Sequence, residues 1–151
     1  DRTGFAFNPI TEKYEDTEVK KTAFLGLNKA ADDSTIYHEV GHHLEYTKPG
    51  LQQKANDFVS RRTKDTPPVN LSKYGMSGEV GNEDNFYDAF IAVRPGGTEF
   101  GARSAAAYVG KTYKSGSTEV ISMGMELLVE DAQAFAEADP DYFEFIVDAL
   151  R

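Results

Sequence analysis

The chain has 151 residues, 40% hydrophobic and 12% aromatic, a composition that suits one globular domain and hardly two. Its 16 basic and 25 acidic residues give a net charge of −9, which argues against a nucleic-acid-binding surface and against binding to anionic membranes. The chain has no cysteine, so disulfide scaffolds, thiol nucleophiles and cysteine-ligated metal sites are excluded.

The N-terminal segment DRTGFAFNPI has neither an initiator methionine nor the basic-then-apolar pattern of a signal peptide. No apolar run approaches the roughly 18 residues of a membrane span. We therefore expect residues 1–151 to form a single domain that belongs to a longer chain. The cellular location is left unknown, because a chain without cysteine tolerates either redox environment.

The first third of the chain predicts a small sheet followed by a helix. Apolar residues favour strands over 5–10 and 22–27. The short acceptor side chains of Asp32, Asp33 and Ser34 are typical of a helix start, so we expect a helix over 35–46 that ends at Pro49-Gly50.

A second helix is predicted over 51–62, where apolar residues recur at helical spacing, and Thr66-Pro67-Pro68 ends the pattern. From 69 to 117 the chain is glycine-rich and reads as irregular, and long stretches of this kind are often functional loops. The apolar positions of the second helix are Leu51, Ala55, Phe58 and Val59.

Two further helices are predicted at the C-terminal end. The first covers 117–138, and in the second, which extends to Leu150, Asp139 is the N-cap and Pro140 the first helical residue. The coarse expectation is a helix-rich α+β fold with a small N-terminal sheet. The expected core positions are Ile121, Met125, Leu128, Ala132 and Phe135 in the first of these helices, and Phe143, Ile146 and Leu150 in the second.

The segment His38-Glu39-Val40-Gly41-His42 matches the pattern H-E-x-x-H on a predicted helix. Residues i and i+4 share one helical face, so both imidazoles can reach one metal ion. Glu39 lies beside the first ligand and can accept a proton from a metal-bound water, as a general base. All three histidines of the chain lie in this helix, and His43 points away from the ligand face.

A catalytic zinc site needs a third protein ligand, with water in the fourth position. Position 48 is lysine, so no third histidine follows the motif, and Glu45 on the same helix would be nearly collinear with the two imidazoles. We expect Glu119, in the first turn of the third helix, to supply the third ligand, although first turns also favour acidic residues in general. The alternatives are Glu126 and Glu130 on the same face, and Glu79, Glu83 and Asp84 in the preceding segment.

A peptide-cleaving site also uses a polar group to stabilise the oxyanion of the tetrahedral intermediate. Tyr113 is the first candidate for this catalytic role, because it comes shortly before Glu119 in the chain. Tyr108 and Arg103 are the alternatives.

The motif His38-Glu39-Val40-Gly41-His42, followed much later by Glu119-Val120-Ile121-Ser122, resembles the gluzincin class of zinc metallopeptidases. The resemblance implies a zincin-like fold with an active-site helix, one Zn²⁺ per chain, His38, His42 and Glu119 as ligands, and Glu39 as general base. The sequence departs at Met123, where thermolysin-like members carry an aspartate that orients a ligand histidine.

A second resemblance extends from about Phe86 to Leu150. The pattern Tyr108-Val-Gly-Lys-x-Tyr113, then Thr118-Glu-Val-Ile-Ser-Met-Gly124, then Asp139-Pro-Asp-Tyr-Phe143, is similar to zincin-like domains joined to phage head-morphogenesis (minor head) proteins and to toxin-like chains. It implies that other domains of a parent chain are partners.

The leading hypothesis is a zinc-dependent endopeptidase that acts on a peptide or protein substrate. The main alternative is a structural, metal-stabilised domain of a phage particle or toxin without peptidase activity. A carboxylate-bridged di-iron protein is disfavoured, because that site needs a second Glu-x-x-His and no other histidine exists. A metal-free binding module is the last alternative.

Overall fold

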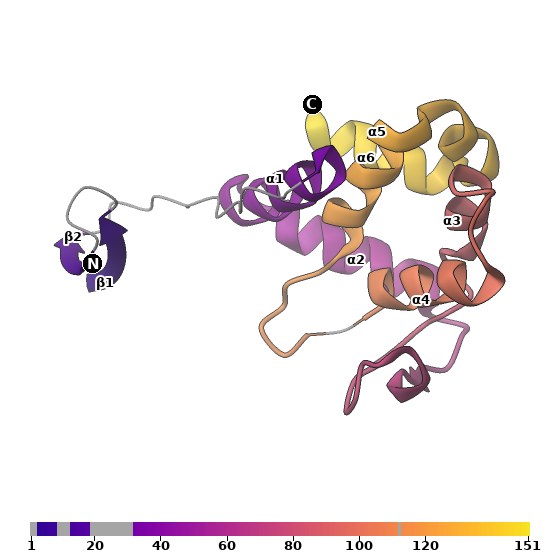
Figure 1. Cartoon of the computed structure of the whole chain (residues 1–151), viewed down its shortest axis with the longest axis horizontal. Helices are drawn as coiled ribbons and strands as arrows, with labels where there is room; N and C mark the ends of the chain where they lie inside the picture. The colour runs from indigo at the N-terminus through magenta and orange to yellow at the C-terminus, as the bar shows by residue number, and fades with distance from the viewer. Residues whose placement is uncertain (1–2, 9–12, 19–31, 112) are drawn as a thin grey trace.

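The computed structural model describes residues 3–8, 13–18, 32–111 and 113–151, and it shows a helix-rich α+β fold, as predicted (Figure 1). β1 (Thr3–Asn8) and β2 (Lys13–Glu18) form an antiparallel hairpin in which Thr3 pairs with Glu18. This hairpin overlaps the strand predicted over 5–10, whereas the strand predicted over 22–27 lies outside the described residues. The helical part comprises α1 (Asp33–Thr47), α2 (Leu51–Thr63), α3 (Tyr87–Val93), α4 (Glu99–Val109), α5 (Val120–Ala138) and α6 (Pro140–Leu150), with the short β3 (Val69–Asn70), 3₁₀ turn η1 (Ser72–Tyr74) and β4 (Val80–Gly81) between α2 and α3.

The helices α1 and α2 confirm the sequence prediction within two residues at each end. The carboxylate of Asp32 accepts a hydrogen bond from the amide of Thr35 at 2.8 Å and caps α1. Pro49 and Gly50 separate the two helices, and Gly50 adopts a left-handed conformation with φ 77° that favours glycine. The four apolar positions predicted for α2 are all buried.

The prediction of an irregular segment over 69–117 is wrong, because α3 and α4 lie in it. α3 buries Ala89, Phe90 and Val93 against α5, and α4 is rich in alanine, the best helix former. Thr98 caps α4 by accepting a hydrogen bond from the amide of Gly101 at 3.0 Å. The glycines at 96, 97 and 101 obscure this helix in the sequence, since they lie at and near its start.

α5 is central, and it packs against α1, α3 and α6 (Figure 1). It begins at Val120 rather than near the predicted residue 117, with Glu119 at the N-cap position. The backbone leaves helical geometry at Asp131, whose side chain accepts a hydrogen bond from the amide of Ala134 at 3.0 Å. This kink changes the phase of the apolar stripe, so the stripe is confirmed only in part: Ile121, Met125 and Phe135 are buried, Leu128 is partly buried and Ala132 is exposed.

α6 begins as predicted, with Asp139 accepting a hydrogen bond from the amide of Tyr142 at 3.1 Å and with Pro140 in the first turn. Its buried face is rotated from the predicted one. Tyr142, Ile146 and Ala149 are buried, whereas Phe143 is only partly buried and Leu150 is 44% exposed. Gly124 in α5 explains this rotation, because a Cβ there would lie 3.1 Å from Cε2 of Tyr142 and 2.3 Å from Cδ1 of Ile146, so the missing side chain makes room for both residues.

α1 and α5 approach each other closely at Gly41. A Cβ built on Gly41 would lie 2.5 Å from the Cα of Ser122 and 2.8 Å from its amide nitrogen, so only glycine fits between these two backbones. This contact brings the H-E-x-x-H segment of α1 against the first turn of α5. None of the described helices combines the length and apolar character that a bilayer crossing requires.

Candidate metal centre

α1 presents two imidazoles to the start of α5. His38 and His42 lie one turn apart, and their rings meet edge to face with centroids 4.8 Å apart. Their Nε2 atoms lie 3.1 Å from each other. This is the geometry that the i, i+4 spacing predicts for two ligands of one metal ion.

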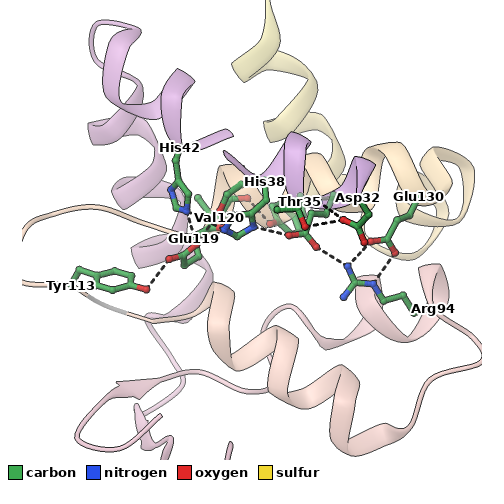
Figure 2. Close-up of polar contacts among 12 residues, drawn as sticks. Asp32, Thr35, His38, His42, Arg94, Tyr113, Glu119, Val120 and Glu130 are labelled. Carbon is green, nitrogen blue, oxygen red and sulfur yellow. Dashed lines mark hydrogen bonds and ion pairs between the residues drawn. The ribbon is translucent and has the colours of Figure 1, made fainter. Parts of the chain in front are cut away.

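Glu119 brings a carboxylate to the same point from the N-cap of α5 (Figure 2). Its Oε2 lies 3.1 Å from Nε2 of His42 and 3.5 Å from Nε2 of His38. Ligand atoms bound tetrahedrally to zinc at its usual bond lengths lie about 3.3 Å apart. The three observed separations fit this value, and the donor set of two histidines and one glutamate is one that catalytic zinc sites use.

Glu119 is held as an ionised carboxylate. Burial opposes its ionisation, but hydrogen bonds from His42, Tyr113 and Ser122 outweigh that effect and lower the pKa of Glu119 to about 2. The hydroxyl of Tyr113 donates to Oε1 at 2.8 Å, and the hydroxyl of Ser122 donates to Oε2 at 3.0 Å. The bond to Glu119 also raises the pKa of His42.

Glu126 orients the first histidine. Its Oε1 lies 2.6 Å from Nδ1 of His38, and Arg94 contacts its Oε2 at 2.9 Å. Burial opposes ionisation of Glu126, but the bonds from His38 and Arg94 outweigh it and lower the pKa of Glu126. An ionised carboxylate only accepts hydrogen bonds, so Nδ1 of His38 carries the proton and its Nε2 lone pair faces the metal position.

The sequence interpretation did not assign this role to Glu126, which it treated as an alternative third ligand. Its carboxylate contacts the far nitrogen of His38 instead of the ligand cluster. The resemblance to thermolysin-like enzymes points to position 123 for an orienting carboxylate, and that residue is Met123 here. Glu126 lies two turns beyond Glu119 on the same face of α5, and that spacing is the feature that points to it.

Replacing Glu126 by alanine is expected to weaken zinc binding by about 10- to 100-fold, because the His38 ring loses the partner that fixes its tautomer. A competition titration with a chromophoric chelator measures this change. Glu130→Ala is the matched control, since Glu130 also contacts Arg94, at 2.6 Å, and lies one turn further along α5. Equal zinc affinities in the two variants would contradict the role of Glu126.

The remaining acidic alternatives are engaged outside the cluster. Glu79 contacts Nζ of Lys111 at 2.9 Å, and Glu83 contacts Nζ of Lys73 at 2.6 Å. Asp84 pairs with Arg103. Among the described residues, only His38, His42 and Glu119 form a group of potential ligands with atoms within 4.8 Å of one another.

The two tyrosines predicted as oxyanion candidates lie beside the cluster. Tyr113 contacts Glu119, and the ring of Tyr108 lies 6.4 Å from that of His38. Burial and the nearby carboxylate of Glu119 raise the pKa of both phenols, so both remain hydrogen-bond donors at neutral pH. Arg103 contacts Glu99 at 3.1 Å on the surface of α4 and takes no part in this arrangement.

Glu39 is partly buried beside these groups, and its negative charge acts on His42 and raises the pKa of that residue. A cavity of about 450 Å³ borders the cluster through Tyr108 and Met123, of which Met123 comes one turn after Glu119. Its wall is mainly apolar and is formed by Tyr74, Met76, Phe100, Gly101, Ser104, Ala105, Tyr108 and Met123.

Comparison with known proteins identified no relative of this chain. No family model matches the chain, and neither the curated proteins nor the solved structures contain a match to it. The resemblance to gluzincins and to zincin-like phage and toxin domains therefore stays a prediction that depends on the motif residues. The close approach of His38, His42 and Glu119 is evidence for a metal site that does not depend on this resemblance.

Proposed function

We propose that this protein is a zinc-dependent endopeptidase with a zincin-like site. The observation that carries the proposal is the convergence of three ligand atoms, Nε2 of His38, Nε2 of His42 and Oε2 of Glu119, at separations of 3.1 to 3.5 Å. Glu39, the residue that follows the first ligand, lies beside them.

Each of these residues has its own role in the proposed hydrolysis of a peptide bond. Zinc held there would supply Lewis acidity, which lowers the pKa of water towards neutrality and polarises a peptide carbonyl. Glu39 accepts the proton of the attacking water and delivers it to the leaving nitrogen. Tyr108 can donate a hydrogen bond to the oxygen on which negative charge develops, and Tyr113 can do so when its single hydroxyl proton, which it donates to Glu119 here, is directed to that oxygen instead.

Three protein ligands with an open fourth position are typical of catalytic zinc, whereas structural zinc has four protein ligands. Glu45 shares a face of α1 with His38 and His42, so it is a candidate for a fourth ligand. Both of its oxygens instead accept hydrogen bonds from Thr118, at 2.8 Å each. The absence of a fourth ligand among the described residues favours the catalytic proposal over a purely structural metal site.

The surroundings of the site suggest the kind of substrate. The adjoining cavity has a mainly apolar wall and suits an apolar side chain of a peptide. The net charge of −9 favours the approach of basic chains. A test panel of peptides should therefore combine aromatic or aliphatic residues with flanking lysine and arginine.

The proposal is tested by metal analysis followed by peptide cleavage. Protein purified without chelator is expected to contain about one zinc per chain by mass spectrometry and to cleave members of the panel. Chelation should abolish cleavage, and added zinc should restore it. One zinc per chain without cleavage of any peptide would favour the structural alternative, and no bound metal after zinc dialysis would overturn both.

A further inference from the structure

Glu45 is a buried carboxylate in the last full turn of α1. Its side chain is only 4% exposed, and it accepts hydrogen bonds from the amide and from the hydroxyl of Thr118, at 2.8 Å each. The two residues are 73 positions apart in the chain. Thr118 is the residue immediately before Glu119, so this contact ties the metal-binding helix to the backbone that carries the third ligand.

Burying the carboxyl group of Glu45 costs free energy, and packing alone does not explain why this residue is there. Burial raises the pKa of Glu45, and the bonds from Thr118 only partly oppose that effect. Replacing both partners of a buried hydrogen bond by apolar groups of the same shape can be nearly neutral or even stabilising. The buried carboxyl group at position 45 therefore calls for an explanation other than stability.

The start of α5 explains why a carboxyl group is buried at position 45. Glu119 occupies the N-cap position, but its side chain forms no capping hydrogen bond to the helix, because its oxygens are directed at the histidines and at Tyr113 and Ser122. The positive end of the helix dipole thus lacks its own capping group. From another helix, Glu45 brings two hydrogen-bond acceptors to Thr118, just before the start of α5.

The contact between Glu45 and Thr118 is one of three successive contacts where α1 crosses α5. Glu45 meets Thr118, Gly41 approaches Ser122, and His38 meets Glu126. The partners on α5 and just before it are spaced by four residues, and the order is reversed on α1, so the helices run antiparallel here. Glu119 lies between the first two of these contacts.

We propose that Glu45 is a positioning residue, which holds the backbone at Thr118 so that the carboxylate of Glu119 meets His38 and His42 at ligand distance. The inference depends on the metal-binding part of the proposed function and not on peptide cleavage. Metal ligands must be held within about 0.5 Å of their working positions by a supporting shell. Loss of the Glu45 contact should therefore loosen the third ligand while the two imidazoles stay in place.

The test compares metal binding in Glu45→Leu, which removes both acceptor oxygens, and in Thr118→Val with the unaltered protein. Each variant is expected to bind zinc about 10- to 100-fold more weakly, the range seen when partners of metal ligands are removed. Cobalt-loaded protein should show a changed visible absorption spectrum, because the ligand field changes when Glu119 shifts. Thr118→Ser keeps the hydroxyl and should restore both readouts.

Asp139→Asn is the matched control for a merely structural effect. Asp139 is also a buried carboxylate, it accepts a hydrogen bond from a helix-start amide, and it pairs with Arg62 at 2.7 Å. It belongs to α6 and has no contact with the metal cluster. This variant should lower the melting temperature but leave the zinc affinity and the cobalt spectrum unchanged.

The outcomes separate the inference from the proposed function. Folded Glu45→Leu protein with unchanged zinc affinity and cobalt spectrum would overturn the role of Glu45, and Thr118→Val gives the same decision if Glu45→Leu does not fold. Zinc binding that depends on Glu45, in a protein that cleaves no peptide, would support the inference and contradict the peptidase proposal.

Discussion

Glu39→Gln is expected to lower kcat/KM for peptide cleavage by roughly 10²- to 10⁴-fold, the usual contribution of a general base. Glutamine keeps the size of the side chain but cannot accept the proton of the attacking water at neutral pH. Glu39 is not part of the ligand cluster, so the variant should still bind one zinc per chain. Cleavage rates and zinc content, measured on the same preparation, check both halves of this expectation.

Two variants on the same helix serve as controls for that experiment. His43→Ala changes a partly buried neighbour outside the ligand cluster and should retain activity and zinc. His42→Ala removes a ligand and should lose both. A Glu39→Gln enzyme as fast as the unaltered one would rule out Glu39 as the base, whatever its zinc content.

Gly41→Ala is expected to destabilise the protein and to weaken zinc binding at the same time. Alanine forms helix better than glycine by about 1 kcal/mol, so the local effect alone would stabilise α1. The new Cβ would lie 2.5 Å from the Cα of Ser122, and neither backbone can yield without separating α1 from α5. Forced packing of this kind costs about 1–3 kcal/mol, and here the contact is with backbone atoms. We therefore expect a net loss near the upper end of that range.

Urea unfolding of metal-free protein measures the first effect, and a zinc competition titration measures the second. Gly96→Ala is the control, because no atom lies within 4 Å of the added Cβ and the backbone there does not require glycine. Its effect on the free energy of unfolding should stay within about 0.5 kcal/mol. If Gly41→Ala were as stable as the unaltered protein, the close approach of the two helices would be contradicted.

Several helix boundaries could be predicted from the sequence because their causes are local. Asp32 and Asp139 cap α1 and α6 through amides three residues further along the chain, and Pro49-Gly50 ends the first helix beside its last turn. In α2 the apolar spacing also identified the buried face correctly. Each of these signals acts within a few residues of its source.

The wrong predictions concern helices whose position or buried face depends more on packing against other helices than on the local sequence pattern. α3 and α4 were predicted to be irregular, because their glycine-rich surroundings hid short helices that are stabilised by burial against other elements. The face of α6 is predicted with Phe143 and Leu150 inside, but the space beside Gly124 admits Tyr142 together with Ile146, and of the three predicted positions only Ile146 is fully buried. The spacing within a short helix is compatible with both rotations, so only the neighbouring helix decides between them.

One part of the candidate site could likewise be predicted from the sequence, whereas the other part depends on how the helices pack. The pairing of His38 with His42 and the place of Glu39 beside them follow from the sequence alone, because one turn of helix sets their relative positions. The position of Glu119 beside the histidines, the contact of Glu126 with His38 and the contact of Glu45 with Thr118 all depend on how α5 crosses α1. The last two contacts join residues that are 88 and 73 positions apart. That crossing is set by the contact of Gly41 with Ser122, in which two backbones meet across a missing side chain. A glycine in a sequence does not reveal which backbone will approach it, and for that reason only the tertiary structure could place Glu119, Glu126 and Glu45 around the two histidines.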